Sequence, residues 1–219
     1  MPESVRVIGL GAGGHAKVVL ETLAAMGGFD VVGLLDPRDE LTGASVHGVP
    51  VLGEDELLGR EYDEGVTHAF IGLAGSGDTR PRRRLFDLAR SHGFEIVSAV
   101  HPRAFVSPSA VLGDGATILA ASVVNTDARL GRNVIVNTGA IVEHDCRIGD
   151  HVHVASGARL ASGVRVDEGA HIGLGASIVQ GLHVGAGSTV GAGAVVVRDV
   201  EPGVVTVGVP ARVLRQVAI

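Results

Sequence analysis

The chain has 219 residues, which is enough for one large domain or two modest ones, each with a core of its own. Its 18 Lys and Arg stand against 24 Asp and Glu, and this net charge of −6 argues against nucleic acid or an anionic membrane as the main partner, because both require a basic face. With one cysteine, no run of about 18 apolar residues and no apolar leader, we expect a cytoplasmic protein without internal disulfides.

The first hundred residues alternate short apolar runs with helix-like stretches. Strands are predicted at 5–10, 31–35, 68–73 and 95–100, and helices at 15–26 and 82–92. This alternation predicts a small Rossmann-like α/β domain over residues 1–103, with about four parallel strands.

A glycine-rich turn joins the first predicted strand to the first helix. Gly9, Gly11 and Gly14 match the spacing of a dinucleotide-binding loop, and Asp36 ends the next strand, where a ribose hydroxyl is usually bound. Only about half of a dinucleotide-binding fold fits before residue 104, which argues against an NAD-dependent dehydrogenase. We expect Gly11, Gly13 and Gly14 to hold the phosphates of one nucleotide, with Asp36 on its ribose. Alternatively, the glycines only allow tight packing.

Two sets of basic residues in the first hundred positions could meet phosphates. His15 begins the helix, where a cation opposes the helix dipole unless an anion is close. A bound phosphate would be such an anion, and an exposed neutral capping histidine is the alternative. The run of Arg80, Arg82, Arg83 and Arg84 can also meet phosphates, although most such runs are solvated helix faces.

From residue 104 onward the sequence repeats every six residues. The repeat contains the aliphatic residues Val106, Leu112, Ile118, Val124, Leu130, Val136, Val142, Ile148, Val154, Leu160, Val166, Ile172, Ile178, Val184, Val190 and Val196. Small residues commonly stand four places after each of them, and many of the 33 glycines lie in the same repeats. Six residues form one short strand and a corner, and three such units close a triangular coil. The pattern predicts a parallel β-helix of about five coils. It resembles the left-handed hexapeptide-repeat β-helix, whose best-known members are trimeric acyl-CoA transferases.

Five histidines lie between residues 144 and 183. His144 is expected at an outward corner beside Glu143 and Asp145, and an imidazole next to a carboxylate is the usual general base. His153 and His171 are eighteen residues apart and therefore one coil apart. For His171, as for His151 and His183, an ordinary surface position is the alternative to a functional one. Cys146 occupies a small inward position, so we expect a buried structural residue rather than an acyl nucleophile.

A zinc site is the main alternative use of these histidines. The γ-class carbonic anhydrases share this fold and bind zinc through three histidines, two of them five residues apart. The nearest spacings here are two, seven and nine residues, so we expect no metal site.

Several motifs together resemble the nucleotide-sugar N-acetyltransferase family of the bacillosamine-pathway and perosamine type, with which sialic-acid O-acetyltransferases are grouped. The resemblance covers essentially the whole chain. It rests on GAGGHAK at 11–17, Asp36, His101-Pro102, NTGAIVEHDCRIGDHVHVASGA at 137–158 and GVPAR at 208–212.

The resemblance implies a role for each matching residue. His144 would be the catalytic base, Asp145 would polarise it, and Asn137 and His153 would line the acetyl and amine site. The acetyl-CoA arm would run between two subunits. Its expected contacts are Ser162, Leu174, Gly175 and Ala192. A backbone N–H or His153 would hold the thioester oxygen as negative charge builds on it.

The expected function is acetyl transfer from acetyl-CoA to a UDP- or GDP-linked amino sugar, at C4 of a deoxy sugar, for surface glycan or glycoprotein biosynthesis. Residues 1–103 would bind the nucleotide sugar, and residues 104–219 would form the acetyltransferase β-helix with a C-terminal tail. His144 and His153 are nine residues apart, which is half a coil, so one subunit is not expected to bring both to one acetyl group. A homotrimer with shared sites follows. A sugar O-acetyltransferase and a non-catalytic nucleotide-binding scaffold remain open.

Overall fold

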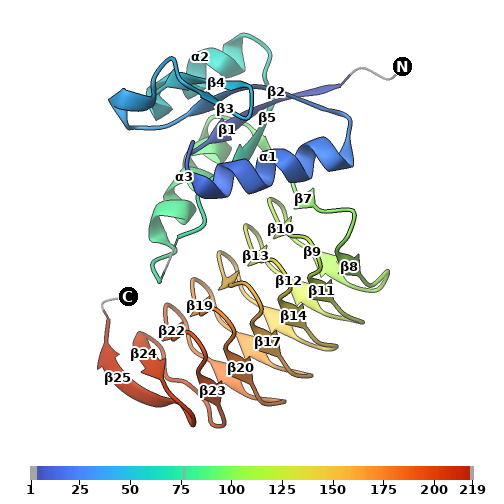
Figure 1. The fold of residues 1–219 in the computed structure, drawn as a ribbon, viewed down its shortest axis with the longest axis vertical. Coiled ribbons are helices and arrows are strands. Elements are labelled where there is room, and N and C mark those ends of the chain that lie inside the picture. The colour runs from blue at the N-terminus through green and yellow to red at the C-terminus, as the bar shows by residue number, and fades with distance from the viewer. Residues whose placement is uncertain (1–3, 76, 218–219) are drawn as a thin grey trace.

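The computed structural model describes residues 4–75 and 77–217, which form an α/β domain at one end of a long β-helix (Figure 1). The sheet of the α/β domain has the strand order β3-β4-β2-β1-β5-β6, in which only β3 is antiparallel to its neighbour. Its strands are β1 (Val5–Leu10), β2 (Phe29–Leu35), β3 (Ser45–Val46), β4 (Val49–Gly53), β5 (His68–Ile71) and β6 (Glu95–Ile96). The predicted strands at 5–10, 31–35 and 68–73 are confirmed as β1, β2 and β5, and the short β3–β4 hairpin is an addition.

Helices cover both faces of this sheet. They are α1 (Gly14–Met26), α2 (Leu58–Asp63) and α3 (Arg80–Ser91), and none of the described helices is long and apolar enough to cross a membrane. β1 is buried on both sides: Val7 packs in the cluster that contains α1, while Ile8 packs in the cluster that contains α3. This double burial explains why β1 reads as a continuous apolar run rather than an alternating one.

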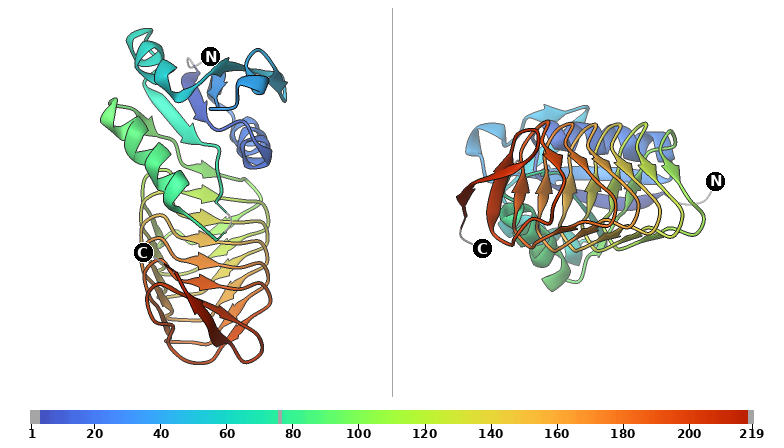
Figure 2. Two further views of the ribbon diagram at one scale, coloured as in Figure 1. Left: turned by 90° about the vertical axis from the view of Figure 1, so that its left-hand side faces the viewer. Right: turned by 90° about the horizontal axis from the view of Figure 1, so that it is seen from below.

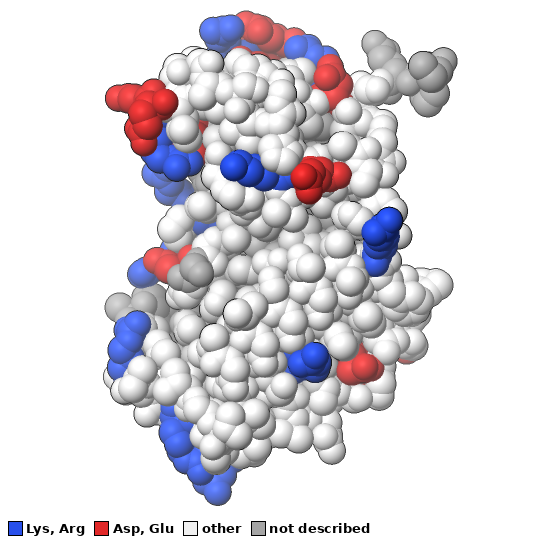
Figure 3. All heavy atoms as spheres, in the orientation of Figure 1, with Lys and Arg blue, Asp and Glu red and all other residues white. Residues whose placement is uncertain are grey.

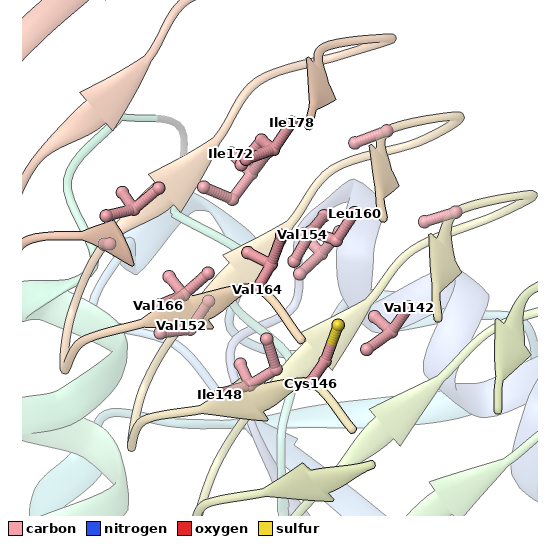
Figure 4. Packing of buried hydrophobic residues seen from close by; sticks show 14 of the residues in the cluster. Val142, Cys146, Ile148, Val152, Val154, Leu160, Val164, Val166, Ile172 and Ile178 are labelled. Atoms are coloured by element: carbon pink, nitrogen blue, oxygen red, sulfur yellow. The ribbon is translucent and has the colours of Figure 1, made fainter. Parts of the chain in front are cut away.

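The second part of the chain is a left-handed parallel β-helix with three sheets. From β7 to β23 the paired strand residues are eighteen positions apart, as in Ile135 with His153 and His153 with His171, which confirms the predicted coil. The last coil is shorter, because Thr189 pairs with Val205. Fourteen of the sixteen repeat residues are buried in one continuous core, and the other two, Val106 and Leu112, pack against it (Figure 4). The side chain of Cys146 points into this core, as predicted, and burial raises the pKa of its thiol to about 11.

The three sheets are named here by chain order. The first coil sheet contains β7 (Ala99–Val100), β10 (Thr117–Ile118), β13 (Ile135–Val136), β16 (His153–Val154), β19 (His171–Ile172), β22 (Thr189–Val190), β24 (Val204–Val207) and β25 (Arg212–Gln216). The second contains β8 (Phe105–Val106), β11 (Val123–Val124), β14 (Ile141–Val142), β17 (Arg159–Leu160), β20 (Ser177–Ile178) and β23 (Val195–Val196). The third contains β9 (Val111–Leu112), β12 (Arg129–Leu130), β15 (Arg147–Ile148), β18 (Arg165–Val166) and β21 (His183–Val184).

The passage between the two parts lies within the predicted strand 95–100. β6 completes the sheet of the α/β domain, whereas β7 pairs with β10 and opens the first coil sheet. The stack of coils therefore starts at Ala99, five residues before the expected boundary at 104. At the other end β25 turns back antiparallel to β24.

The outward faces of the three sheets differ in chemistry. The α/β domain and the segment that joins β5 to α3 lie over the first coil sheet (Figure 2). The second coil sheet presents mainly apolar side chains, among them Phe105, Val123, Ile141 and Val195, and Phe105 is 55% exposed. The third presents Arg129, Arg147 and Arg165 in register. The outward face of the second coil sheet is thus mostly apolar, with Arg159 on β17 as its exposed charged residue.

Candidate active site

The segment between β5 and α3 crosses the first coil sheet and is called the crossing loop here (residues 72–75 and 77–79). Gly75 O accepts a hydrogen bond of 3.0 Å from His153 Nδ1, and the Thr79 hydroxyl donates to Gly169 O at 2.8 Å. These contacts join the α/β domain to the middle coils. They also create the wall of a pocket.

A pocket of about 800 Å³ lies between the crossing loop, the start of α1 and the corner that joins the first and second coil sheets. Five predicted site residues line it: His15, Asn137, His153, Leu174 and Ala192. The rest of its described lining comprises Leu73, Ala74, Gly75, Gly77, Ala155, Ser156, His171, Gly173, Thr189, Val190 and Gly191. The fold therefore brings His15 at the glycine turn together with four of the residues expected to meet the acetyl group or acetyl-CoA.

The imidazole of His153 is held in a defined state. A carbonyl oxygen can only accept, so Nδ1 carries the proton that binds Gly75 O. Burial and the neighbouring His171 lower the pKa of His153 to about 4, and the neutral ring then has a lone pair at Nε2, 3.2 Å from Asn137 Nδ2. A neutral ring in this tautomer cannot donate to a thioester oxygen. Of the two expected oxyanion donors, the structure therefore favours a backbone N–H over His153.

Two of the three coil histidines that could be ordinary surface residues are buried, and the third is exposed. His171 is buried against His153, with ring centroids 4.9 Å apart. His151 is buried too: it accepts a hydrogen bond of 2.9 Å from Asn133 Nδ2 and meets the edge of Phe86. For these two, the surface alternative is wrong because the α/β domain covers the first coil sheet. His183 is exposed, as that alternative expects.

His144 and Asp145 lie at a different corner, the one that joins the second and third coil sheets. Their side chains are exposed, and His144 Nδ1 is 2.7 Å from Asp145 Oδ2, so the expected pair forms. Neither residue lines the 800 Å³ pocket. Ser162 follows this corner one coil later, where Gly163 N donates to His144 O. The residues expected to meet acetyl-CoA thus lie at two corners. Ser162 lies at the corner of His144, whereas Leu174, Gly175 and Ala192 lie at the corner of Asn137.

The glycines of the N-terminal turn have two different roles. Gly11 has a φ of +102°, and a Cβ there would lie 3.1 Å from the backbone of Gly72, so glycine is required by the fold. A Cβ on Gly13 would meet nothing closer than 3.8 Å, and one on Gly14 would meet nothing within 4 Å. These two positions border open space at the N-terminus of α1, where free N–H groups bind anions.

His15 stands at this helix N-terminus and faces the pocket. Its Nε2 is buried and has no hydrogen-bond partner within the described part of the chain. Burial, followed by the nearby charge of Arg82, lowers the pKa of His15 to about 3. The residue is therefore neutral and only partly exposed, and its free ring nitrogen is available to a ligand.

Asp36 differs from the expectation for a ribose ligand. It is buried, and its carboxylate accepts from Ala12 N at 2.8 Å and from Arg38 Nε at 2.7 Å. Hydrogen bonding by Arg38 lowers the pKa of the Asp36 carboxyl. Its oxygens are thus already engaged in holding the glycine turn, and the group that faces Gly13 is the half-exposed Arg38 guanidinium. The sequence offered one signal for this pairing: Arg38 stands two residues after Asp36.

Arg82 also contradicts the interpretation of 80–84 as a solvated run. It is 1% exposed and lies between the crossing loop and the β-helix, whereas Arg80, Arg83 and Arg84 are exposed. As for metals, the described residues contain no group of three or more His, Cys, Asp or Glu side chains placed to hold an ion.

Two family models match the chain. Residues 6–89 match the PglD N-terminal domain, and residues 127–162 match the bacterial transferase hexapeptide. No curated protein sequence matches.

Solved structures extend the likeness to the whole chain. Perosamine N-acetyltransferase from Caulobacter crescentus, in complex with CoA and GDP-perosamine, is 43% identical with a TM-score of 0.90, over 96% of this chain and 97% of that one. The acetyltransferase domain of PglB from Neisseria gonorrhoeae, in complex with acetyl coenzyme A, is 40% identical with a TM-score of 0.88, over 96% and 100%. WeeI from Acinetobacter baumannii is 28% identical with a TM-score of 0.83, over 95% and 100%. The chain therefore belongs to the nucleotide-sugar N-acetyltransferases that join a PglD-type domain to a hexapeptide-repeat β-helix.

Proposed function

We propose that the protein transfers acetyl from acetyl-CoA to the amine of a nucleotide-linked amino sugar, at C4 of a deoxy sugar. One observation carries the proposal: a single pocket joins the free N-terminus of α1 to His153 and Asn137 and to the corner with Leu174 and Ala192. The 43% identical relative with CoA and GDP-perosamine supports both substrates. The reaction would take place in the cytoplasm, and its product would be used in the biosynthesis of a surface glycan or a glycoprotein.

The proposed chemistry needs no covalent acyl-enzyme. The nucleotide sugar binds with its phosphates at Gly13, Gly14 and His15, and its amine lies near His153. The amine nitrogen attacks the thioester carbonyl and His144 takes the amine proton. The C–S bond then breaks, and the proton on His144 passes to the leaving thiolate, so that CoA is released as the thiol. Asp145, 2.7 Å from His144, stabilises the imidazolium that forms. On binding, an amine N–H takes the place of Asn137 Nδ2, which lies 3.2 Å from His153 Nε2, as the donor to that ring nitrogen, and this contact directs the nitrogen lone pair toward the carbonyl.

This chemistry requires a second subunit. His144 lies at the corner of the second and third coil sheets, whereas Asn137 and the pocket lie at the corner of the first and second. Both corners border the second coil sheet, whose outward face is apolar, and Figure 3 shows few charged side chains where β11, β14, β17 and β20 lie in Figure 1. We propose a homotrimer in which this sheet faces the threefold axis, so that each pocket receives His144 from a neighbour.

The same arrangement gives acetyl-CoA a path. Leu174, which is 60% exposed, and Ala192 stand one coil apart on the pocket's corner, where Gly193 N donates to Leu174 O. An extended pantetheine arm would run along this column past Gly175. Ser162, one coil beyond His144, would approach it from the neighbouring subunit.

A thiol-release assay with acetyl-CoA tests the activity. The acceptors are UDP-, GDP- and dTDP-linked 4-amino deoxy sugars, with sialic acid and the matching 4-hydroxy sugars as controls. We expect thiol release with at least one amino sugar and an N-acetyl product by mass spectrometry. Acetylation of the hydroxyl controls alone would establish an O-acetyltransferase instead, and binding of a nucleotide sugar without turnover would establish a scaffold.

The N-terminal turn gives a separate prediction. Gly13→Val should raise KM for the nucleotide sugar at least tenfold and leave KM for acetyl-CoA unchanged, because its side chain occupies the space at the α1 N-terminus. The backbone at Gly13 is extended, with a φ of −87°, so valine fits without strain. Gly11→Val is the comparison: it should lower the melting temperature instead. Equal effects of Gly13→Val on both KM values would contradict a phosphate site at the turn.

A further inference from the structure

His171 lines the 800 Å³ pocket beside His153, and the proposed chemistry does not use it. It stands on β19, one coil after His153, and the two rings meet edge to face with their centroids 4.9 Å apart. Only 8% of His171 is exposed, and its Nδ1 is buried without a hydrogen-bond partner among the described residues. Buried polar groups normally have partners, so this ring requires an explanation.

The surroundings of His171 determine where its ring proton lies. Burial lowers the pKa of His171, so the ring is neutral at pH 7 and carries one proton. A buried N–H without an acceptor is costly and Nδ1 has no acceptor, so the proton lies on Nε2, the ring nitrogen left for the pocket. His153 has the opposite tautomer, with its proton on Nδ1 and a lone pair on Nε2. The pocket wall therefore presents a hydrogen-bond acceptor and, beside it, a donor.

We propose that His171 is a specificity-determining residue whose Nε2–H donates to the sugar hydroxyl on the carbon next to the acceptor amine, which is C3 when the amine is at C4. This assignment rests on the proposed function, in which His153 Nε2 accepts an amine N–H. A hydroxyl oxygen accepts and an amine N–H donates, so a vicinal amino alcohol matches the two rings group for group. Because the rings are in contact, they suit groups on neighbouring carbons of one sugar.

Neighbouring polar side chains of the pocket wall are engaged elsewhere. The hydroxyl of Thr189, one coil after His171, donates to Gly77 O at 3.4 Å, and Asn137 Oδ1 accepts from Thr138 N at 2.8 Å. A sugar without the C3 hydroxyl would leave the His171 N–H unpaired in an enclosed site, and sites built for a hydroxyl reject such analogues for this reason. The wild-type enzyme should therefore discriminate against a 3-deoxy acceptor.

The kinetic test crosses two substrates with two proteins. The substrates are the acceptor that the thiol-release assay identifies and its 3-deoxy analogue. The proteins are the wild type and His171→Phe, whose ring has a similar shape but no N–H. Removing the hydroxyl should lower the wild-type kcat/KM by about 10- to 100-fold, mainly through KM. In His171→Phe the two substrates should have nearly equal kcat/KM, and His171→Gln, whose amide N–H donates, should restore part of the difference.

His151→Phe is the matched control. His151 is also buried, against Phe86 of the α/β domain, but it lies outside the lining of this pocket. Its variant should keep the wild-type discrimination. The proposal would be overturned by a wild type that accepts both sugars equally. It would also be overturned if folded His171→Phe kept the wild-type ratio, whether or not both substrates became slower.

A measurement without substrate tests the tautomer and does not depend on the folding of a variant. Nitrogen NMR at pH 7 should show the proton of His171 on Nε2 and that of His153 on Nδ1, and an Nδ1–H tautomer of His171 would contradict the assignment. If no amino sugar is acetylated, the proposed function fails by itself. Calorimetry with a nucleotide-linked amino sugar and its 3-deoxy analogue then makes the same comparison of wild type with His171→Phe, and equal affinities of the wild type for both would overturn the role of His171.

Discussion

Replacing His144 with alanine should lower kcat by about 10² to 10⁴ and leave acetyl-CoA binding nearly unchanged. The amine loses a proton as it attacks the thioester, and His144 is the exposed imidazole whose Nδ1 lies 2.7 Å from the Asp145 carboxylate. Without it, solvent must take the proton. The side chain is 52% exposed and packs into no core, so the fold is expected to survive. Steady-state kinetics and acetyl-CoA calorimetry on the purified variant measure both effects.

The chain contains a matched control for this substitution. His183 is also exposed, and its Nε2 lies 2.8 Å from Asp167 Oδ2, so it repeats the histidine–aspartate pair away from the pocket. His183→Ala should retain nearly full turnover. If His144→Ala also did so in a folded protein, His144 would not be the base.

Co-expressing His144→Ala chains with His153→Ala chains should restore about a quarter of wild-type activity, although each parent alone is inactive. In the proposed trimer each site takes His153 from one chain and His144 from its neighbour. With random assembly in equal amounts, about one interface in four joins two intact histidines, and cyclic symmetry makes every interface equivalent. Specific activity of the unfractionated mixture measures this fraction. Mixed trimers purified through two different affinity tags should instead have about a third of wild-type activity, because each of them contains one such interface in three.

A second mixture distinguishes shared sites from sites within one chain. Wild-type chains mixed equally with chains that carry both substitutions should also give about a quarter if sites are shared, but about half if each site is built from one chain. In the latter case the first mixture would remain inactive. An active monomer by light scattering would likewise contradict the shared site.

The sequence by itself determined the coils and which residues of each coil face the core. In a six-residue repeat the inward position recurs locally, so the aliphatic residues from Ile118 to Val196 could be assigned to the core without knowledge of distant contacts. The same indexing placed His144 at an outward corner, half a coil from His153, and Cys146 inside. Local sequence also predicted β1, the glycine turn and α1, because apolar runs and glycine spacing reflect the conformation of adjacent residues.

Only the tertiary structure decided which outward residues become buried. Repeat position predicts that His171 points outward from its coil, yet the α/β domain covers it. The basic run at 80–84 predicts a solvated helix face, yet Arg82 is enclosed between the crossing loop and the β-helix. The tautomer of His153 likewise depends on Gly75 O, which is 78 residues away in sequence. The carboxylate of Asp36 accepts a hydrogen bond from Ala12 N, which is 24 residues away in sequence. Burial and protonation at these positions arise from contacts between segments distant in sequence, which no local periodicity encodes.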